Sequence, residues 1–422
     1  MRKLAVRVVF FLVALSMSIV AGVSASAPMD TKVTFDKDVA PILYSHCVEC
    51  HRQGEVAPMA LVTYKDARPW ARSIKEKVAS RTMPPWLAAP EYGHFQNDRR
   101  LSEHEIETIS AWVDQGALEG DSRDLPPAPK FVEGWSIGKP DAVIEMPNEV
   151  KVPSDGVIPY MYVTVPTSFG EDRWVQAAEI RAGNRSVVHH IIVFVQDPPR
   201  SKPGQKGNQT ESRGEAMGTK LCGFAPGEQP KVYPPGTAKL IKAGSNLVFQ
   251  LHYTTNGEAA ADRSYVGLIF AKGPVQTPVQ TGTATNATFV IPPGASSYEV
   301  KSTWTAKENV RIVDLMPHMH VRGKDFTYTA VYPDGTSRVI LSVPRYDFNW
   351  QLLYRVKEPL LLPKGSRLDC VAHFDNSTGN RYNPDPSKEV RWGPQTWEEM
   401  MIGWFDYVFD DESAAARASA GR

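Results

Sequence analysis

Two cysteines and a histidine fall within five residues near the start of the chain, in the order Cys47-Val48-Glu49-Cys50-His51. This C-x-x-C-H spacing lets two thiols reach the vinyl groups on one edge of a porphyrin, while the following histidine turns its imidazole to the iron. A zinc half-site would need a second ligand pair nearby, and a thioredoxin-like pair would need a βαβ context. The sequence around the motif offers neither. The motif therefore predicts covalent haem c, bound by Cys47, Cys50 and the axial ligand His51.

The flanks of the motif predict a small all-α unit. Ser102 and Glu105 form a capping box in front of the last helical segment. Residues at helical spacing mark three helices, namely Val39, Ile42, Leu43 and His46, then Ala67, Trp70, Ile74 and Val78, then Ile106, Ile109, Trp112 and Val113. A helix before C-x-x-C-H and an aromatic-bearing helix closing the unit resemble cytochrome c. We therefore expect a cytochrome c domain at residues 26–120.

A sixth iron ligand is expected to be a thioether if this unit carries electrons, because methionine–histidine ligation raises the haem potential. Met83 lies between the second and third predicted helices and is followed by two prolines that stiffen its loop. Met59 is the competing methionine, but it is close to His51 in sequence and is expected to pack on the haem edge. His94 and His104 are expected to be surface histidines.

The first 25 residues have the pattern of a signal peptide. Basic residues are followed by the apolar run Val8 to Val20 and by small residues ending at Ala25. An uncleaved membrane anchor is the alternative, but the apolar run is short for a spanning helix, which needs roughly 20 residues. We expect cleavage, no stable membrane span in the mature protein, and a periplasmic or secreted location.

The composition changes after the helical unit. Residues 121–140 are rich in proline and charge and are predicted to be a linker. Beyond them, short apolar runs broken by turn residues predict an all-β region of sandwich (jelly-roll) type, divided into residues 141–273 and 274–415. The whole chain has 47 basic and 47 acidic residues, and this zero net charge gives no basic excess for binding nucleic acid.

Six of the ten histidines lie in the β-rich region, and most occur inside apolar runs. A His-x-His pair on a strand places both imidazoles on one face, where they can chelate one metal. A His-His dyad on a regular strand would point to opposite faces, so it can chelate only where the backbone is irregular. A lone strand histidine such as His252 is more often a core or edge residue. Unpartnered buried imidazoles are costly, however, and metal coordination explains them together.

The order His-His, His-Tyr, His-x-His and Glu-Met resembles the copper type II, ascorbate-dependent monooxygenases. That family includes peptidylglycine α-hydroxylating monooxygenase and dopamine β-hydroxylase. The resemblance runs from near Val143 to near Val408. It is carried by Val188-His189-His190-Ile191, Leu251-His252-Tyr253, His318-Met319-His320-Val321-Arg322-Gly323-Lys324 and Thr396-Trp397-Glu398-Glu399-Met400.

The resemblance implies two copper ions with different roles. An electron-transfer copper in the first sandwich would be held by His189, His190 and His252. A catalytic, oxygen-activating copper in the second would be held by His318, His320 and Met400, since a thioether favours Cu(I). Met401 is a rival for Met400, and His373 is expected to be structural.

The implied activity is an exported haem- and copper-dependent monooxygenase. It would hydroxylate an aliphatic C–H bond of a small organic substrate with dioxygen, the cytochrome domain supplying electrons from a redox partner protein or small reductant. The alternative is a non-catalytic electron-transfer or copper-binding protein. A β-sandwich binding module with structural histidines is the third interpretation.

The chain also departs from the family. The arginine that grips a peptide carboxylate is replaced by Met316, and an asparagine and a tyrosine beyond the methionine ligand become Ile402 and Trp404. A glycine-extended peptide is therefore not expected, and an apolar pocket is. The family's disulfide beside the methionine cannot form, because Met401 replaces one of its cysteines. Cys370 matches the other cysteine and can pair with Cys222 only if the fold brings them together.

Overall fold

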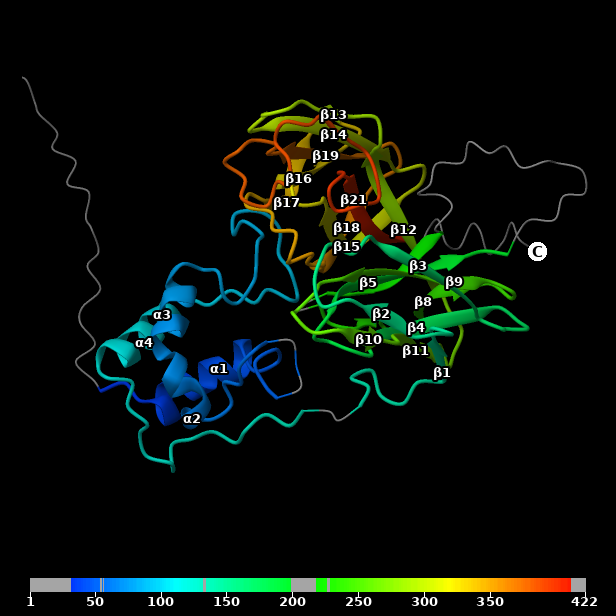
Figure 1. The fold of residues 1–422 in the computed structure, drawn as a ribbon. Helices are drawn as coiled ribbons and strands as arrows, with labels where there is room; N and C mark the ends of the chain where they lie inside the picture. The colour runs from blue at the N-terminus through cyan, green and yellow to red at the C-terminus, as the bar shows by residue number, and fades with distance from the viewer. Residues whose placement is uncertain are drawn as a thin grey trace, which may run out of the picture.

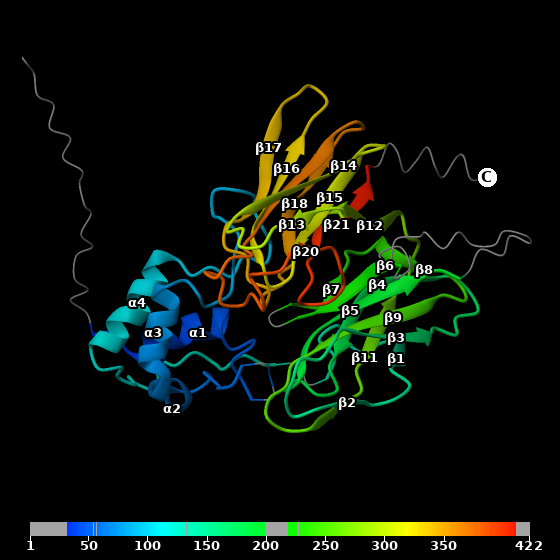
Figure 2. The same ribbon diagram turned by 45° about the horizontal axis from the view of Figure 1, so that its top comes forward.

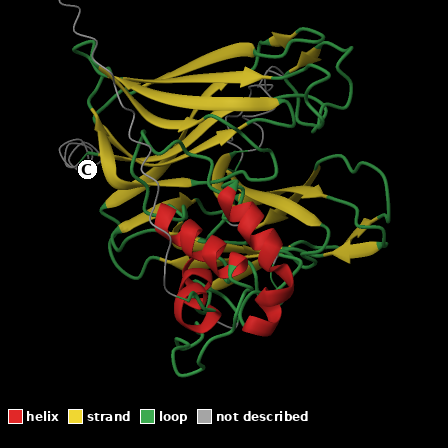
Figure 3. Ribbon diagram, turned by 90° about the vertical axis from the view of Figure 1, so that its left-hand side faces the viewer, coloured by secondary structure: helices red, strands yellow, loops and turns green. Residues whose placement is uncertain are grey.

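The computed structural model describes residues 32–53, 55, 57–131, 134–198, 218–225 and 228–410. The chain is mostly β-sheet with a few short helices, which gather to one side of the sheets (Figures 1 and 3). The β-rich part of the predicted fold class is thereby confirmed. The predicted signal peptide lies outside the described residues. No helix in the described part is long and apolar enough to cross a membrane.

The helical unit forms where the sequence predicts it. Its elements are η1 (Phe35–Val39), α1 (Ala40–His46), α2 (Tyr64–Ala67), η2 (Arg68–Trp70), α3 (Ala71–Ala79) and α4 (Glu103–Asp114). The predicted capping box is present, since the Ser102 hydroxyl accepts the Glu105 N–H and the Glu105 carboxylate accepts the Ser102 N–H. Trp112 is fully buried against Phe35, with ring centroids 6.0 Å apart. A core thus forms between α4 and the N-terminal helices.

The first β unit lies between Ala142 and Phe270. Its strands are β1 (Ala142–Glu145), β2 (Val150–Val152), β3 (Met161–Pro166), β4 (Arg173–Arg181), β5 (Val188–Gln196), β6 (Thr219–Phe224), β7 (Lys231–Val232), β8 (Thr237–Ile241), β9 (Asn246–Tyr253), β10 (Ala260–Asp262) and β11 (Tyr265–Phe270). The sheet β3-β9-β5-β6 faces the strands β1-β11-β4-β8, and side chains from both layers form one apolar core. The alternating apolar residues predicted this burial.

The second β unit repeats the two-layer arrangement. Its strands are β12 (Thr277–Asn286), β13 (Val290–Ile291), β14 (Tyr298–Thr305), β15 (Val310–His318), β16 (Gly323–Val331), β17 (Ser337–Val343), β18 (Tyr354–Leu362), β19 (Arg367–Phe374), β20 (Val390–Arg391) and β21 (Met401–Phe409). The sheet β14-β19-β16-β17 packs on the strands β12-β21-β15-β18, again around one core.

The two β units share a sheet. A short parallel pairing of β8 with β12, Thr237 opposite Thr277, joins their layers into one nine-stranded sheet. The units therefore touch at β8 and β12, and Figure 2 shows the second unit rising away from the first. Four charged residues reinforce this contact: the half-buried Lys231 and the buried Lys239 from the first unit, and the buried Asp314 and Asp406 from the second.

The segment between α3 and α4 leaves the helical unit and packs on the second β unit. Trp86 and Phe95 both pack edge-on or tilted against Tyr354, with ring centroids 5.0 and 5.4 Å away. The Ala89 N–H donates to the Ser342 carbonyl at 2.8 Å, and Phe95 forms an isolated bridge with β18. The loop that carries Met83 is thus anchored to a different unit from the C-x-x-C-H motif.

Candidate metal centres

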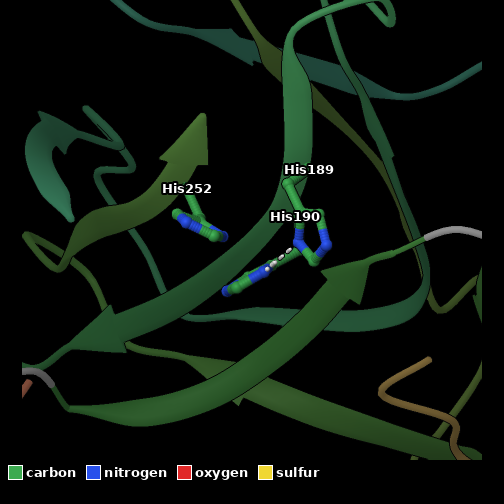
Figure 4. Close-up of side chains that lie close together, drawn as sticks. All are labelled: His189, His190 and His252. Carbon is green, nitrogen blue, oxygen red and sulfur yellow. Dashed lines mark hydrogen bonds between the residues drawn. The ribbon is translucent and has the colours of Figure 1, made fainter. Parts of the chain in front are cut away.

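Three histidines of the first β unit converge on one point. His189 and His190 lie on β5 and His252 on the neighbouring β9, and one ring nitrogen of each lies within 4.8 Å of the others (Figure 4). The β5–β9 register is interrupted between Val188 and His190. This is the irregularity that the His-His dyad needs, because a bulge turns consecutive side chains toward the same side. The cluster could hold a metal ion.

Two ring nitrogens of this cluster have no hydrogen-bond partner among the described residues, whereas His189 Nε2 lies 3.4 Å from the side-chain oxygen of Asn349. The Nδ1 atoms of His189 and His190 lie 3.0 Å apart. Within the described residues, His190 Nε2 and His252 Nδ1 are buried and have no hydrogen-bond partner. Leaving a buried polar atom unsatisfied costs about 1–3 kcal/mol. A metal ion would use these lone pairs, and an all-imidazole set suits copper or zinc.

The second pair of histidines, His318 and His320, is held by polar contacts to the Nδ1 atom of each ring. His318 ends β15, and its Nδ1 lies 2.7 Å from the side-chain oxygen of Gln351. His320 Nδ1 lies 3.1 Å from the Glu398 carbonyl, which can only accept, so this nitrogen carries the proton. Each contact leaves Nε2 as the free lone pair, and this is how proteins orient metal-binding imidazoles.

Met400 and Met401 lie in different surroundings. Met401 is fully buried in the core of the second β unit, and its sulfur accepts a hydrogen bond from the Ser302 hydroxyl at 3.2 Å. Met400 is the residue immediately before β21 and is also buried. The β15–β21 register places His318 opposite Ile402, so Met400 precedes β21 beside the chain segment that carries His320. Met401 is therefore occupied elsewhere. The two residues before Met400 contact His320, since the Glu399 carboxylate accepts the His320 N–H at 2.8 Å and the Glu398 carbonyl lies 3.1 Å from His320 Nδ1.

Tyr160 and Phe348 lie between the two sets of histidines. The Tyr160 ring stacks on His252 with centroids 4.8 Å apart and on His320 at 6.0 Å. Phe348 stacks on His189 at 5.6 Å and meets His320 at 5.9 Å. The two candidate centres therefore adjoin across the contact between the β units. No spacing pattern in the sequence marks Tyr160, Phe348 or Gln351 as site residues. Tyr160 lies just before β3, and Phe348 and Gln351 lie in the loop between β17 and β18.

Burial keeps these imidazoles neutral. It lowers the pKa of His252 and of His320 to about 3, and the pKa of His318 to about 4. Burial also lowers the pKa of His190 well below its usual value, with neighbouring histidines adding to the effect. Neutral imidazole is the form that binds a metal, so the site is ready for binding near neutral pH.

These lowered pKa values predict that the metal-free protein loses stability in mild acid. An unfolded histidine takes up a proton near pH 6.5, whereas folded His252, His318 and His320 do so only near pH 3–4. Stability is therefore full above pH 6.5 and falls as the pH drops toward 4. At pH 5.5 each histidine is expected to cost about 1 kcal/mol. Urea unfolding at pH 7.5 and 5.5 measures this loss, and His252→Ala should reduce it. An equal stability at both pH values would contradict the prediction.

The C-x-x-C-H motif follows α1. Cys47 and Cys50 are free thiols, and burial raises the pKa of Cys47 to about 12. His51 Nδ1 lies 3.2 Å from the Met59 carbonyl, which can only accept, so Nδ1 carries the proton and Nε2 is free. A free Nε2 beside two unpaired thiols fits covalent haem with His51 as axial ligand.

Met83 faces open space. It lines a cavity of about 760 Å³ whose apolar walls include Val78, Leu101 and Ile106. The cavity lining does not reach the two cysteines or His51, so haem attachment rests on the motif and the His51 contact. Met59 instead offers its backbone to His51 and packs on the helical core.

The other predicted residues lie apart from these centres. His94 and His104 are exposed. His373 lies on β19 and pairs with Asp325 at 2.7 Å. Cys222 on β6 and Cys370 on β19 are buried free thiols in different units and form no disulfide with each other.

Comparisons with known proteins add no family. No protein-family model matches the chain, and no curated protein matches it. The VP2 subviral particle of infectious bursal disease virus is 10% identical over 67% of this chain and 75% of that chain, with a TM-score of 0.19. Allantoicase from Saccharomyces cerevisiae is 9% identical over 61% and 80%, with a TM-score of 0.16. The tandem CBM22 domains of Paenibacillus barcinonensis Xyn10C are 8% identical over 66% and 95%, with a TM-score of 0.15. TM-scores this low carry no argument about function.

Proposed function

We propose that this chain is an exported haem- and copper-dependent monooxygenase that hydroxylates an aliphatic C–H bond of a small organic substrate. An N-terminal cytochrome c domain would bind haem through Cys47, Cys50, His51 and Met83. Two jelly-roll sandwiches would follow. One copper would be held by His189, His190 and His252, and the other by His318, His320 and Met400. Copper at such ligands supplies one-electron redox chemistry and dioxygen activation.

The convergence of His189, His190 and His252 carries this proposal. One ring nitrogen of each lies within 4.8 Å of the others, and His190 Nε2 and His252 Nδ1 are buried without a hydrogen-bond partner among the described residues. A core of structural histidines would satisfy such atoms with hydrogen bonds. The pair His318 and His320 lies beside this cluster, so electrons would have a short path between the two metals.

Contacts between the helical unit and the first β unit support electron delivery from the haem. Glu55, four residues beyond His51, forms an ion pair with Arg185. Arg185 lies in the turn that leads into β5, which carries His189 and His190. Gln229 also donates to the Glu49 carboxylate at 3.0 Å. The haem-attachment loop is thus fastened next to the strand of the histidine cluster.

A non-catalytic electron carrier or copper-binding protein is the second candidate function. The cavity lined by Met316 and Trp404, near His318, measures about 20 Å³. This volume suits a single water molecule rather than an organic substrate. Catalysis would therefore need this region to open, whereas electron transfer would not.

Metal analysis with parallel haem quantification tests the proposal. We expect two coppers per haem in the purified protein, and oxygen consumption once the reduced protein meets a substrate. His318→Ala should remove one copper and abolish oxygen consumption while the haem spectrum stays unchanged. His373→Ala is the matched control, because His373 pairs with Asp325 away from the candidate centres and should leave both coppers in place.

Two outcomes would contradict the proposal in different ways. Haem without copper, even after copper loading under reducing conditions, would exclude both copper functions and leave a cytochrome fused to a β-sandwich binding module. Two coppers and reversible reduction without oxygen consumption would favour the electron carrier.

A further inference from the structure

Three cavities meet at one carboxylate, that of Glu228. The largest, about 130 Å³, lies between the helical unit and the first β unit, and Cys50 is in its lining. The second, about 20 Å³, lies between the two β units and is lined in part by Lys220 and Met316. The third, about 10 Å³, lies beside Arg355. Glu228 lines all three, so it connects the side of the haem-attachment motif with the contact between the β units.

The second cavity leads to the face of β15 that carries His318. Met316 and His318 are two residues apart on this strand, so they lie on one face. The Lys220 ammonium lies 2.6 Å from the Met316 sulfur and is buried. Besides burial, the charge of Lys220 lowers the pKa of His318, which places this ammonium within electrostatic reach of the imidazole. The cavities thus run from Cys50 past Glu228 to the neighbourhood of His318.

Glu228 is not held by other groups. Among the residues that the structure describes, its carboxylate has no hydrogen-bond or ion-pair partner, although several charges surround it. Burial raises its pKa, while Lys220, Lys231 and Arg355 lower it and Asp314 raises it. The charged side chains lining the cavity on the helical side are Glu49, Arg52, Glu55, Glu179, Arg181 and Arg185, and Arg99 lines the smallest cavity. A free carboxylate between water-sized spaces can take up a proton on one side and release it on the other.

The proposed reaction consumes protons at a buried site. Converting a C–H bond and dioxygen to an alcohol and water takes two electrons and two protons: RH + O₂ + 2e⁻ + 2H⁺ gives ROH and H₂O. The electrons would come from the haem, but His318 and His320 are buried and neutral. The protons therefore need a separate path through the protein.

We propose that Glu228 is a proton carrier that takes up a proton when the haem is reduced and passes it through the Lys220 cavity toward the His318 and His320 centre. This inference rests on the proposed function. Glu228 touches neither metal-binding set, so its role differs from that of a ligand. Glu228 would couple electron transfer to proton uptake. Reducing the haem adds negative charge, and a nearby carboxylate then binds a proton more tightly.

The haem midpoint potential between pH 5 and 9 tests the uptake step without any copper. The wild-type potential should fall as pH rises across the range in which Glu228 titrates, because reduction is then accompanied by proton uptake. Glu228→Gln should lose this dependence, since an amide takes no proton. Glu179→Gln is the matched control, because Glu179 lines only the cavity on the Cys50 side, and it should keep the wild-type profile. A wild-type profile in Glu228→Gln would overturn the proposal.

Proton uptake during oxygen reduction tests the delivery step. The reduced protein, loaded with haem and copper, is mixed with oxygen and substrate in weak buffer with a pH indicator. Wild type should take up protons in step with haem oxidation, and Glu228→Gln should slow both by about 100-fold. Equal rates in both proteins would overturn delivery through Glu228. A wild-type haem that oxygen does not oxidise would overturn the proposed function and the delivery step, while the haem potential would still decide whether Glu228 takes up the proton.

Discussion

Replacing Cys47 and Cys50 together with alanine is expected to abolish covalent haem attachment. Each thiol forms one thioether bond to the porphyrin, so the double variant has no covalent link left. Haem staining of the denatured protein after electrophoresis measures this directly, because only covalently bound haem survives denaturation. Wild-type protein should stain, and the double variant should not.

The chain contains its own control for this experiment. Cys222 and Cys370 are also free thiols, but they lie in the cores of the β units. Cys222→Ala should keep the haem stain at the wild-type level. Staining of the Cys47 and Cys50 double variant, or its loss in Cys222→Ala, would contradict attachment at the C-x-x-C-H motif.

Asp406→Ala is expected to give the largest loss of stability among substitutions at the contact between the β units. Asp406 is buried, lies 2.9 Å from the Lys239 ammonium and 3.0 Å from the Lys231 ammonium, and accepts the Thr281 hydroxyl at 2.6 Å. Burial alone would raise its pKa, but the two lysines hold it below its usual value. Removing this carboxylate takes away the ion pair of the buried Lys239 ammonium and leaves the half-buried Lys231 paired with Asp314. The free energy of unfolding should fall by about 3–5 kcal/mol.

Asp410→Ala is the matched control. Asp410 follows the same strand and pairs with Arg311 at 2.7 Å, where both side chains are partly exposed to solvent. Loss of such a partly exposed pair should cost less than the loss of the buried one, about 1 kcal/mol. Denaturant unfolding of both variants compares the two effects. A loss in Asp406→Ala no larger than that in Asp410→Ala would show that the buried charges do not stabilise this contact.

The buried charges also matter for the candidate centres. Asp406 lies on β21, which pairs with β15, and β15 ends at His318. Lys231 and Lys239 come from the unit that holds the three-histidine cluster. The network therefore fixes the relative position of the two sets of histidines. A weakened network should loosen the packing of Tyr160 between His252 and His320 as well as the global fold.

Several features followed from the sequence because they depend on short-range chemistry. The capping box at Ser102 and Glu105 needs only two residues at fixed spacing, and it is present. The apolar runs around His190 and His252 predicted strands, since alternation and branched side chains favour them locally. The irregular strand that a His-His dyad would need for chelation is present as the β5–β9 register shift at His190, while chelation itself stays a prediction.

Other features depend on contacts between distant segments. The Glu-Met register of the family resemblance favours Met400 over its neighbour Met401, and the structure adds that Met401 is buried against Ser302. The packing of Trp86 on the second β unit could not be predicted from the sequence, because its partner Tyr354 lies far along the chain. The haem, the copper ions and the reaction itself stay predictions from motif and resemblance.

The sequence by itself determined which residues have side chains able to bind a metal and which local structures hold them, because side-chain type and periodicity are local properties. Only the tertiary structure decided what lies between those residues. Tyr160 and Phe348 join the two sets of histidines, and Glu228 joins three cavities. Such positions depend on how separate layers pack, since each layer presents its side chains to a neighbour that the local pattern does not encode.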